Sequence, residues 1–133
     1  FTAPDLNGNL ISITDKIRGK IALIDLWASW CMPCRAKAKA MIPIYEKYKG
    51  KGFEIVGIAR EFKNTEKMKE AITKDQYPWL QLVELNDQNQ IWTRYMLGNA
   101  GGGVFLVDPN GTILSVNPTP QEVQAELVKR FGE

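Results

Sequence analysis

The sequence predicts an α/β fold in which a central mixed β-sheet is covered by helices on both faces. Apolar runs of strand length alternate with amphipathic segments of helical period along the first two thirds of the chain. Later, Pro109-Asn110-Gly111 separates two short apolar runs, which is typical of a hairpin turn. Alternating strands and helices favour parallel pairing, and a hairpin adds antiparallel strands, so the sheet is expected to be mixed. With 133 residues, no repeats and no linker, the chain is predicted to be a single domain over residues 1–133.

Periodicity and turn residues place each element in order. The first is an N-terminal β-hairpin over residues 6–13, with Asn7-Gly8-Asn9 at its turn. Strands are then expected over residues 21–27, 53–59, 80–85, 104–108 and 112–116, and helices over residues 33–49, 64–75 and 91–97.

The last helix has the clearest start signal. Thr119 is the expected N-cap, Pro120 takes the first helical position, and Glu122 stands three residues after the cap, which together make a capping box. The side chains expected to face the core from this helix are Val123, Leu127, Val128 and Phe131.

Composition excludes several classes of protein. The hydrophobic fraction of 44% and the charged fraction of 24% are those of an average globular domain. No apolar run has the length of a membrane span. The net charge is +2 with no basic stripe among aromatics, so no nucleic-acid partner is expected. Because the chain begins with Phe1 and not Met, we expect a mature or excised domain without its targeting segment.

Cys31 and Cys34, the two cysteines of the chain, lie between the predicted strand 21–27 and the predicted helix 33–49. Two thiols at a strand-to-helix junction indicate thiol-disulfide exchange. A structural staple is the first alternative, but closing so short a loop stabilises by only about 2 kcal/mol. A zinc site is the second, but the chain has no histidine and no third cysteine, so we expect neither a metal ion nor another cofactor.

The helical period predicts different environments for the two thiols. Cys34 falls on the apolar face and is expected to point toward the core, whereas Cys31 falls at the start of the helix. Unpaired N–H groups there favour a thiolate. Lowering a thiol pKa from about 8.5 to about 7 raises its ionised fraction at pH 7 from about 3% to about half. Cys31 is therefore predicted to be the nucleophile, and Cys34 the resolving thiol. The apolar face comprises Cys34, Ala38, Met41, Ile42, Tyr45 and Tyr48.

Asp25 is a carboxylate in the middle of an apolar strand, six residues before Cys31. Burial of an ionised acid is costly, so the pKa of Asp25 is expected to rise toward neutrality, and the group could then accept the proton of Cys34. The alternative is that strand alternation or a neighbouring lysine solvates Asp25.

Residues 21–34, with the core Trp30-Cys31-Met32-Pro33-Cys34, resemble the active-site segment of the thioredoxin superfamily. The start of the chain, Phe1-Thr2-Ala3-Pro4-Asp5-Leu6-Asn7-Gly8, and the later Phe105-Leu106-Val107-Asp108-Pro109-Asn110-Gly111 resemble its TlpA/ResA-like branch, among the AhpC/TSA and Redoxin-like proteins. The resemblance implies a thioredoxin-like fold and an extracytoplasmic thiol-disulfide oxidoreductase, periplasmic or anchored to the membrane and facing the periplasm.

The resemblance also assigns residues. Cys31 and Cys34 correspond to the redox pair and Asp25 to the buried acid. Glu61 is similar to a glutamate that some members place near the dithiol, although a glutamate at a loop edge is often only solvated. The surface around the reactive sulfur is expected to comprise Trp30, Met32 and Pro33, while Trp27, Trp79 and Trp92 are expected in the core or at its rim.

One position departs from the family pattern. Members usually carry a cis-proline three residues before the phenylalanine of the strand that faces the dithiol, but here Gly102 precedes Gly103, Val104 and Phe105. Glycine permits backbone angles closed to other residues. We therefore expect a more mobile loop, more open sulfurs, altered substrate docking along Gly102 and Gly103, and easier adventitious metal capture. The alternative is that these glycines serve only the turn.

These observations predict an enzyme that reduces or interchanges protein disulfides. No histidine lies between the cysteines, which favours a reductant. The expected partners are disulfide-containing client proteins and a separate thiol donor, the expected state is a monomer, and a membrane tether would lie outside residues 1–133. A peroxiredoxin-type peroxidase is disfavoured because Ala28 stands three residues before Cys31, where threonine or serine is needed. A non-enzymatic binding domain with a vestigial dithiol stays open.

Overall fold

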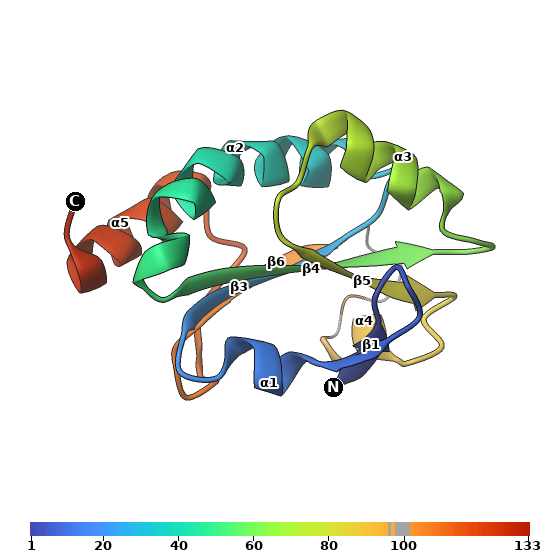
Figure 1. The fold of residues 1–133 in the computed structure, drawn as a ribbon, viewed down its shortest axis with the longest axis horizontal. Helices are drawn as coiled ribbons and strands as arrows, with labels where there is room; N and C mark the ends of the chain where they lie inside the picture. The colour runs from blue at the N-terminus through green and yellow to red at the C-terminus, as the bar shows by residue number, and fades with distance from the viewer. Residues whose placement is uncertain (96, 98–101) are drawn as a thin grey trace.

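The computed structural model describes residues 1–95, 97 and 102–133 as a central sheet between two helical layers (Figure 1). The strands are β1 Thr2–Pro4, β2 Leu10–Ser12, β3 Ile21–Trp27, β4 Phe53–Glu61, β5 Leu80–Leu85, β6 Gly103–Val107 and β7 Ile113–Val116. The helices are α1 Ile13–Ile17, α2 Met32–Tyr48, α3 Glu66–Asp75, α4 Ile91–Arg94 and α5 Pro120–Phe131, with a 3₁₀ turn at Lys49–Lys51. The predicted α/β class is confirmed.

The main sheet has five strands in the order β5-β4-β3-β6-β7. β3 is parallel to β4, and β4 to β5, whereas β6 and β7 run antiparallel to their neighbours. β3 lies at the centre, and all seven of its residues are buried. A strand covered on both faces cannot alternate apolar and polar side chains, which explains its nearly continuous apolar sequence.

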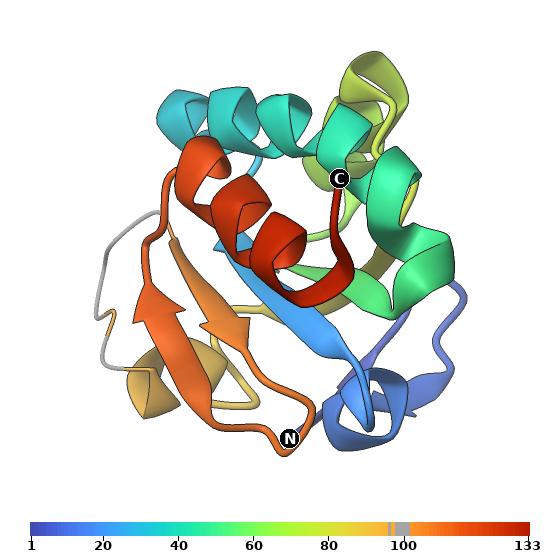
Figure 2. The ribbon, with the colours of Figure 1, turned by 90° about the vertical axis from the view of Figure 1, so that its left-hand side faces the viewer.

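Helices α2, α3 and α5 cover one face of the sheet, and α1 and α4 lie on the other (Figures 1 and 2). Each face has its own buried cluster. Leu23 and Trp27 point to the first face with Met41 of α2, while Ile24 and Leu26 point to the second. This alternation along β3 leaves Asp25 on the face that α2 covers.

The predicted capping box of the last helix is confirmed. The backbone N–H of Glu122 donates to the Thr119 hydroxyl at 3.1 Å, and the backbone N–H of Thr119 donates to the Glu122 carboxylate at 3.0 Å. Val123 and Leu127 are fully buried, as expected.

Several boundaries differ from the sequence prediction. The hairpin pairs Thr2–Pro4 with Leu10–Ser12 as a separate two-stranded sheet, because the Asp5 carboxylate accepts from the N–H groups of Asn7 and Asn9 and closes the turn earlier. The short helix α1 was not predicted; Ser12 caps it by accepting from the N–H of Asp15. The helix predicted over residues 91–97 ends at Arg94, and residue 96 lies outside the described residues.

Within the described ranges, the structure has no helix whose length and apolarity would suit a membrane crossing.

Candidate active site

The two cysteines lie at the start of α2 and are joined by a disulfide with a Cα–Cα distance of 5.3 Å. A turn closed by the Cys31 N–H and the Ala28 carbonyl at 3.0 Å brings the chain from β3 to the helix. Cys31 is the N-cap, and its Sγ accepts from the backbone N–H of Cys34 at 3.3 Å. Cys34 packs against the core cluster under α2. The predicted difference in their positions is therefore present, with Cys31 at the helix start and Cys34 against the core.

Asp25 lies in β3 with only 5% of its surface exposed. Burial raises its pKa to about 7, and the positive charge of Lys37 opposes part of that rise. Asp25, Cys34 and Lys37 line one small cavity of about 150 Å³. The alternative of an Asp25 solvated by strand alternation is wrong, since the carboxyl is buried. The structure brings the predicted acid and the predicted resolving thiol to the same space.

Lys37 was not predicted as a site residue. It lies on α2, one turn after Cys34, and shares with Asp25 both this cavity and a smaller neighbouring one. Residues three apart lie on the same side of a helix, so the spacing from Cys34 to Lys37 was the available signal. Its ammonium favours the ionised form of Asp25. The sequence alternative of a neighbouring lysine is thus correct in part, although the pKa of Asp25 remains well above its ordinary value.

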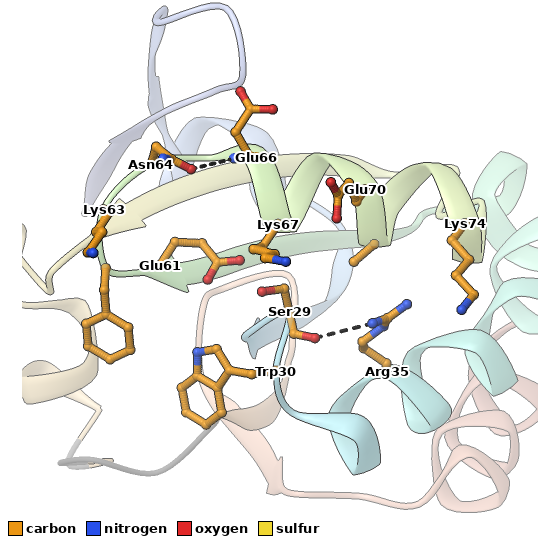
Figure 3. A pocket seen from close by; sticks show the side chains of 12 residues that line it. Ser29, Trp30, Arg35, Glu61, Lys63, Asn64, Glu66, Lys67, Glu70 and Lys74 are labelled. Atoms are coloured by element: carbon orange, nitrogen blue, oxygen red, sulfur yellow. Dashed lines mark hydrogen bonds between the residues drawn. The ribbon is translucent and has the colours of Figure 1, made fainter.

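Glu61 ends β4 and is 4% exposed, so the alternative of a solvated loop glutamate is wrong. Burial raises its pKa, while hydrogen bonding with Ser29 opposes that rise. Its Oε1 is buried without a hydrogen-bond partner. Glu61 does not line the cavity of Asp25 and Cys34. It lines a separate groove of about 800 Å³, together with Ser29 and Trp30 (Figure 3).

An exposed apolar surface surrounds Cys31. Trp30 is 49% exposed and Met32 61%, as predicted for the surface beside the reactive sulfur. Phe62 is 51% exposed and stacks on Trp30, with ring centroids 6.3 Å apart. Phe62 was not predicted, because its sequence position after β4 carries no sign of its contact with Trp30. The expectation that Trp27, Trp79 and Trp92 serve packing is consistent with their burial in the two cores.

Arg35 fastens the dithiol segment to the body of the domain. Its guanidinium donates two hydrogen bonds to the Asp75 carboxylate, at 2.7 and 3.1 Å, and one to the Ser29 carbonyl at 3.3 Å. The Tyr77 hydroxyl donates to the same carboxylate at 2.7 Å. This fork holds the loop before Cys31, the first turn of α2 and the end of α3 together. Sequence reasoning missed it because Arg35 and Asp75 are 40 residues apart.

Gly102 approaches the end of β3 so closely that a side chain has no room. A Cβ at position 102 would overlap the carbonyl oxygen of Leu26 and lie 3.0 Å from the Cα of Trp27. Gly102 also lines the cavity of Asp25 and Cys34. This contact supplies a backbone reason for glycine at position 102, where the family pattern noted in the sequence leads one to expect proline; Gly101 lies outside the described residues. Gly103 begins β6 and is buried.

Among the described residues no cluster of three or more metal-ligating side chains occurs.

The chain is similar to known proteins over most of its length. Residues 1–116 match the AhpC/TSA family. The chain belongs to that family. It is 32% identical over 114 residues to a thiol-disulfide oxidoreductase ResA of Bacillus cereus, covering 86% of this chain and 63% of that protein. It is also 28% identical to a probable glutathione peroxidase 2 of Arabidopsis thaliana, covering all of this chain and 92% of that protein.

Solved structures agree on the fold of this AhpC/TSA family member. The thioredoxin domain of a thiol-disulfide oxidoreductase from Bacteroides vulgatus superposes with a TM-score of 0.84 at 30% identity, over 100% of this chain and 93% of that domain. The predicted thioredoxin-like fold and the predicted TlpA/ResA-like membership of the thioredoxin superfamily are confirmed.

The buried Asp25 makes stability depend on pH. In the folded protein the carboxyl keeps its proton up to pH about 7, whereas in the unfolded chain it ionises near pH 4. Stability from this group is therefore complete below pH 4 and falls as the pH rises to about 7. We expect Asp25→Asn to raise the free energy of unfolding by about 2 to 4 kcal/mol at pH 8 and to change it little at pH 3.5. Urea denaturation at both values measures this, and equal gains at both would contradict it.

The charge of Lys37 should act directly on Asp25. In Lys37→Met we expect the pKa of Asp25 to rise further above its wild-type value, because the cation that favours the carboxylate is gone. A ¹³C-NMR titration of the Asp25 carboxyl measures this. Lys39→Met on the same helix is the matched control and should leave the titration unchanged; an equal effect of both variants would rule out a specific contact.

The close approach at position 102 predicts a cost for any side chain there. Gly102→Ala should lower the free energy of unfolding by about 1 to 3 kcal/mol, because the methyl group must displace either the Leu26 backbone or the segment that carries residue 102. Gly50→Ala is the control, since a Cβ at position 50 meets nothing within 4 Å. Thermal unfolding of both variants tests this, and similar melting temperatures would show that the segment accommodates a side chain.

Proposed function

We propose that this chain is a thiol-disulfide oxidoreductase domain that reduces disulfides in client proteins. The observation that carries the proposal is the position of the dithiol, with Cys31 capping α2 and Cys34 sharing a cavity with Asp25. The ResA protein of Bacillus cereus and the Bacteroides vulgatus domain bear the same description. The chain spans about 63% of the length of that ResA protein, so its activity, clients and donor are inferred here for the domain alone.

Cys31 is the proposed nucleophile. The N–H groups at the start of α2 and the positive end of its dipole stabilise a thiolate at the N-cap. In the reduced protein this thiolate attacks one sulfur of the client disulfide. A mixed disulfide forms between Cys31 and the client, and the other client sulfur leaves as a thiolate that takes up a proton.

Cys34 is the proposed resolving thiol. Packed against the core, it needs a base to lose its proton, and the Asp25 carboxylate in the same cavity is the proposed acceptor. The Cys34 thiolate then attacks Cys31 Sγ, closing the disulfide seen in this structure and releasing the second client thiol. The client disulfide has gained two electrons and two protons, and a separate thiol donor restores the dithiol.

The remaining predicted site residues have proposed roles at the surface. Trp30, Met32 and Pro33 would contact the client beside Cys31, and the backbone of Gly102 and Gly103 would contact it beside Cys34. Glu61 lines the groove next to Trp30 and is a second proton-transfer candidate, for the leaving client thiolate and not for Cys34. Adventitious metal capture by the reduced dithiol remains a hypothesis, which metal analysis of the reduced protein tests.

The direction of electron transfer and the cellular compartment are also proposed. The absence of a histidine between the cysteines favours a reductant. We infer an extracytoplasmic setting from the TlpA/ResA-like resemblance, in a compartment where client disulfides persist. The proposed state is a monomer, and Trp30 and Met32 are exposed where a protein client would approach Cys31. A measurement of the reduction potential distinguishes a reductant from an oxidant.

A peroxidase is not favoured, although a probable glutathione peroxidase is among the relatives. Ala28 provides no hydroxyl three residues before Cys31. Its carbonyl instead accepts from the Cys31 N–H as part of the turn.

Insulin reduction with dithiothreitol tests the proposal. Wild-type protein should accelerate precipitation of the insulin B chain, and Cys31→Ser should abolish the acceleration because it removes the proposed nucleophile and leaves only Cys34, which is packed against the core. Cys34→Ser should form a mixed disulfide that persists on a non-reducing gel. In Asp25→Asn, which keeps both cysteines, resolution of the mixed disulfide between Cys31 and insulin should be slower by about tenfold or more at pH 7, because general-base assistance to Cys34 is lost. Equal rates for wild type and Cys31→Ser would instead favour a binding domain with a vestigial dithiol.

A further inference from the structure

The groove between α2 and α3 begins at the active site and leads away from it. Its volume is about 800 Å³, within the range of ligand-binding clefts. Trp30, which precedes Cys31 in the sequence, stands at one end with its ring stacked on that of Phe62, and Lys74 stands near the other (Figure 3). Figure 3 shows α3 along one side and the start of α2 along the other. A polypeptide bonded to Cys31 through a disulfide has its neighbouring residues within reach of this groove.

Positive side chains extend across this α2–α3 groove. Lys67 and Lys74 project from α3 toward Ser29 and Arg35 on the opposite side (Figure 3). Neither lysine makes an ion pair within the described parts of the chain. Lys63 adds a third ammonium near Phe62.

Negative charge in the groove is smaller. Asp75 neutralises Arg35 outside the groove lining, so the three lysines face two exposed carboxylates. The side chain of Glu66 points away from Ser29 and Arg35 (Figure 3), which leaves Glu70 and the buried Glu61 as the acidic side chains that oppose the three lysines. The balance along the groove is therefore positive and favours an anionic ligand.

Glu61 provides a second, independent indication that the groove receives a ligand. Glu61 is only 4% exposed, and it lines the groove beside Ser29. Its Oε1 has no hydrogen-bond partner. A buried polar atom without a partner is costly, and a rotation of the Glu61 side chain that turns Oε1 into the groove, toward a donor such as a backbone N–H of a bound chain, would remove that cost.

We propose that the α2–α3 groove binds an acidic segment of the client polypeptide that flanks the cysteine attacked by Cys31. In this arrangement Asp or Glu side chains of the client pair with Lys67 and Lys74, an apolar residue contacts Trp30 and Phe62, and a client N–H donates to Glu61. The inference rests on the proposed function and adds a preference among protein disulfides. Because exposed charge pairs contribute modestly and are screened by salt, the preference is expected to be electrostatic and several-fold.

Two disulfide peptides of equal length test the preference. One carries three Asp or Glu residues next to the cysteine, and the other carries Asn or Gln at the same positions. We expect pre-reduced wild-type protein to reduce the acidic peptide with a kcat/KM about fivefold higher in 20 mM salt, with the ratio falling below about twofold in 0.5 M salt. A ratio of one or less at low salt would overturn the inference.

Charge-matched variants locate the effect. In Lys67→Gln/Lys74→Gln the acidic-to-neutral ratio should fall to near one. Lys16→Gln/Lys129→Gln removes the same net charge from α1 and α5, away from the groove, and should keep the wild-type ratio. Equal ratios in both double variants would show that net charge, and not the groove, causes the preference, and would overturn the inference. Thermal melts confirm that both variants are folded.

Binding of a peptide that cannot react distinguishes recognition by the groove from the proposed oxidoreductase activity. A cysteine-to-alanine version of the acidic peptide cannot react, and we expect it to shift the NMR signals of Lys67, Lys74 and Glu61 in wild-type protein. Such binding together with no reduction of either peptide would support the groove and refute the oxidoreductase. Reduction of both peptides with no shift at these residues would support the oxidoreductase and overturn the groove.

Discussion

The start of α2 is the constraint on which the site depends, because one residue there serves both the helix and the chemistry. Cys31 is the N-cap, and its sulfur accepts from the N–H of Cys34 as a capping oxygen would. The N–H groups of the first turn have no partners within the helix and favour negative charge. The buried face of α2 and the fork from Arg35 to Asp75 fix this helix end relative to β3. The reactive sulfur is thereby held by the same interactions that hold the helix.

Asp25 shows how a stable core accommodates a functional group. β3 is covered on both faces, so a carboxyl within it leaves water whichever way it points. Burial raises its pKa to about 7, near the value at which a group can both accept and release a proton at neutral pH. Lys37 supplies a counter-charge from α2 that limits the rise. Burial of Asp25 lowers the stability of the fold at neutral and higher pH, a cost expected at a position with the proton-transfer role proposed here.

Two cavities lie near the dithiol, one lined by Cys34 and the other by Trp30, the residue before Cys31. The small one joins Cys34 to Asp25, and it is bounded by Gly102, whose backbone lies against Leu26 without room for a side chain. The large one begins at Trp30, contains Glu61 and continues along α3. The proposed proton transfer is thus assigned to the small cavity, and the proposed contact with a client to the larger, charged groove.

Local periodicity, turn residues and caps are enough to predict the α/β class, most strands and helices, the capping box at Thr119 and the placement of the two cysteines, because these features depend on residues that are near one another in the chain. The sequence also indicates a raised pKa for Asp25, because an acidic residue within a continuous apolar strand is expected to be buried. Four further features become apparent only in the folded chain: the burial of Glu61, the approach of Lys37 to Asp25, the pairing of Arg35 with Asp75 and the lack of space at Gly102. Each of these depends on segments distant in sequence being packed together, and no local pattern encodes that packing.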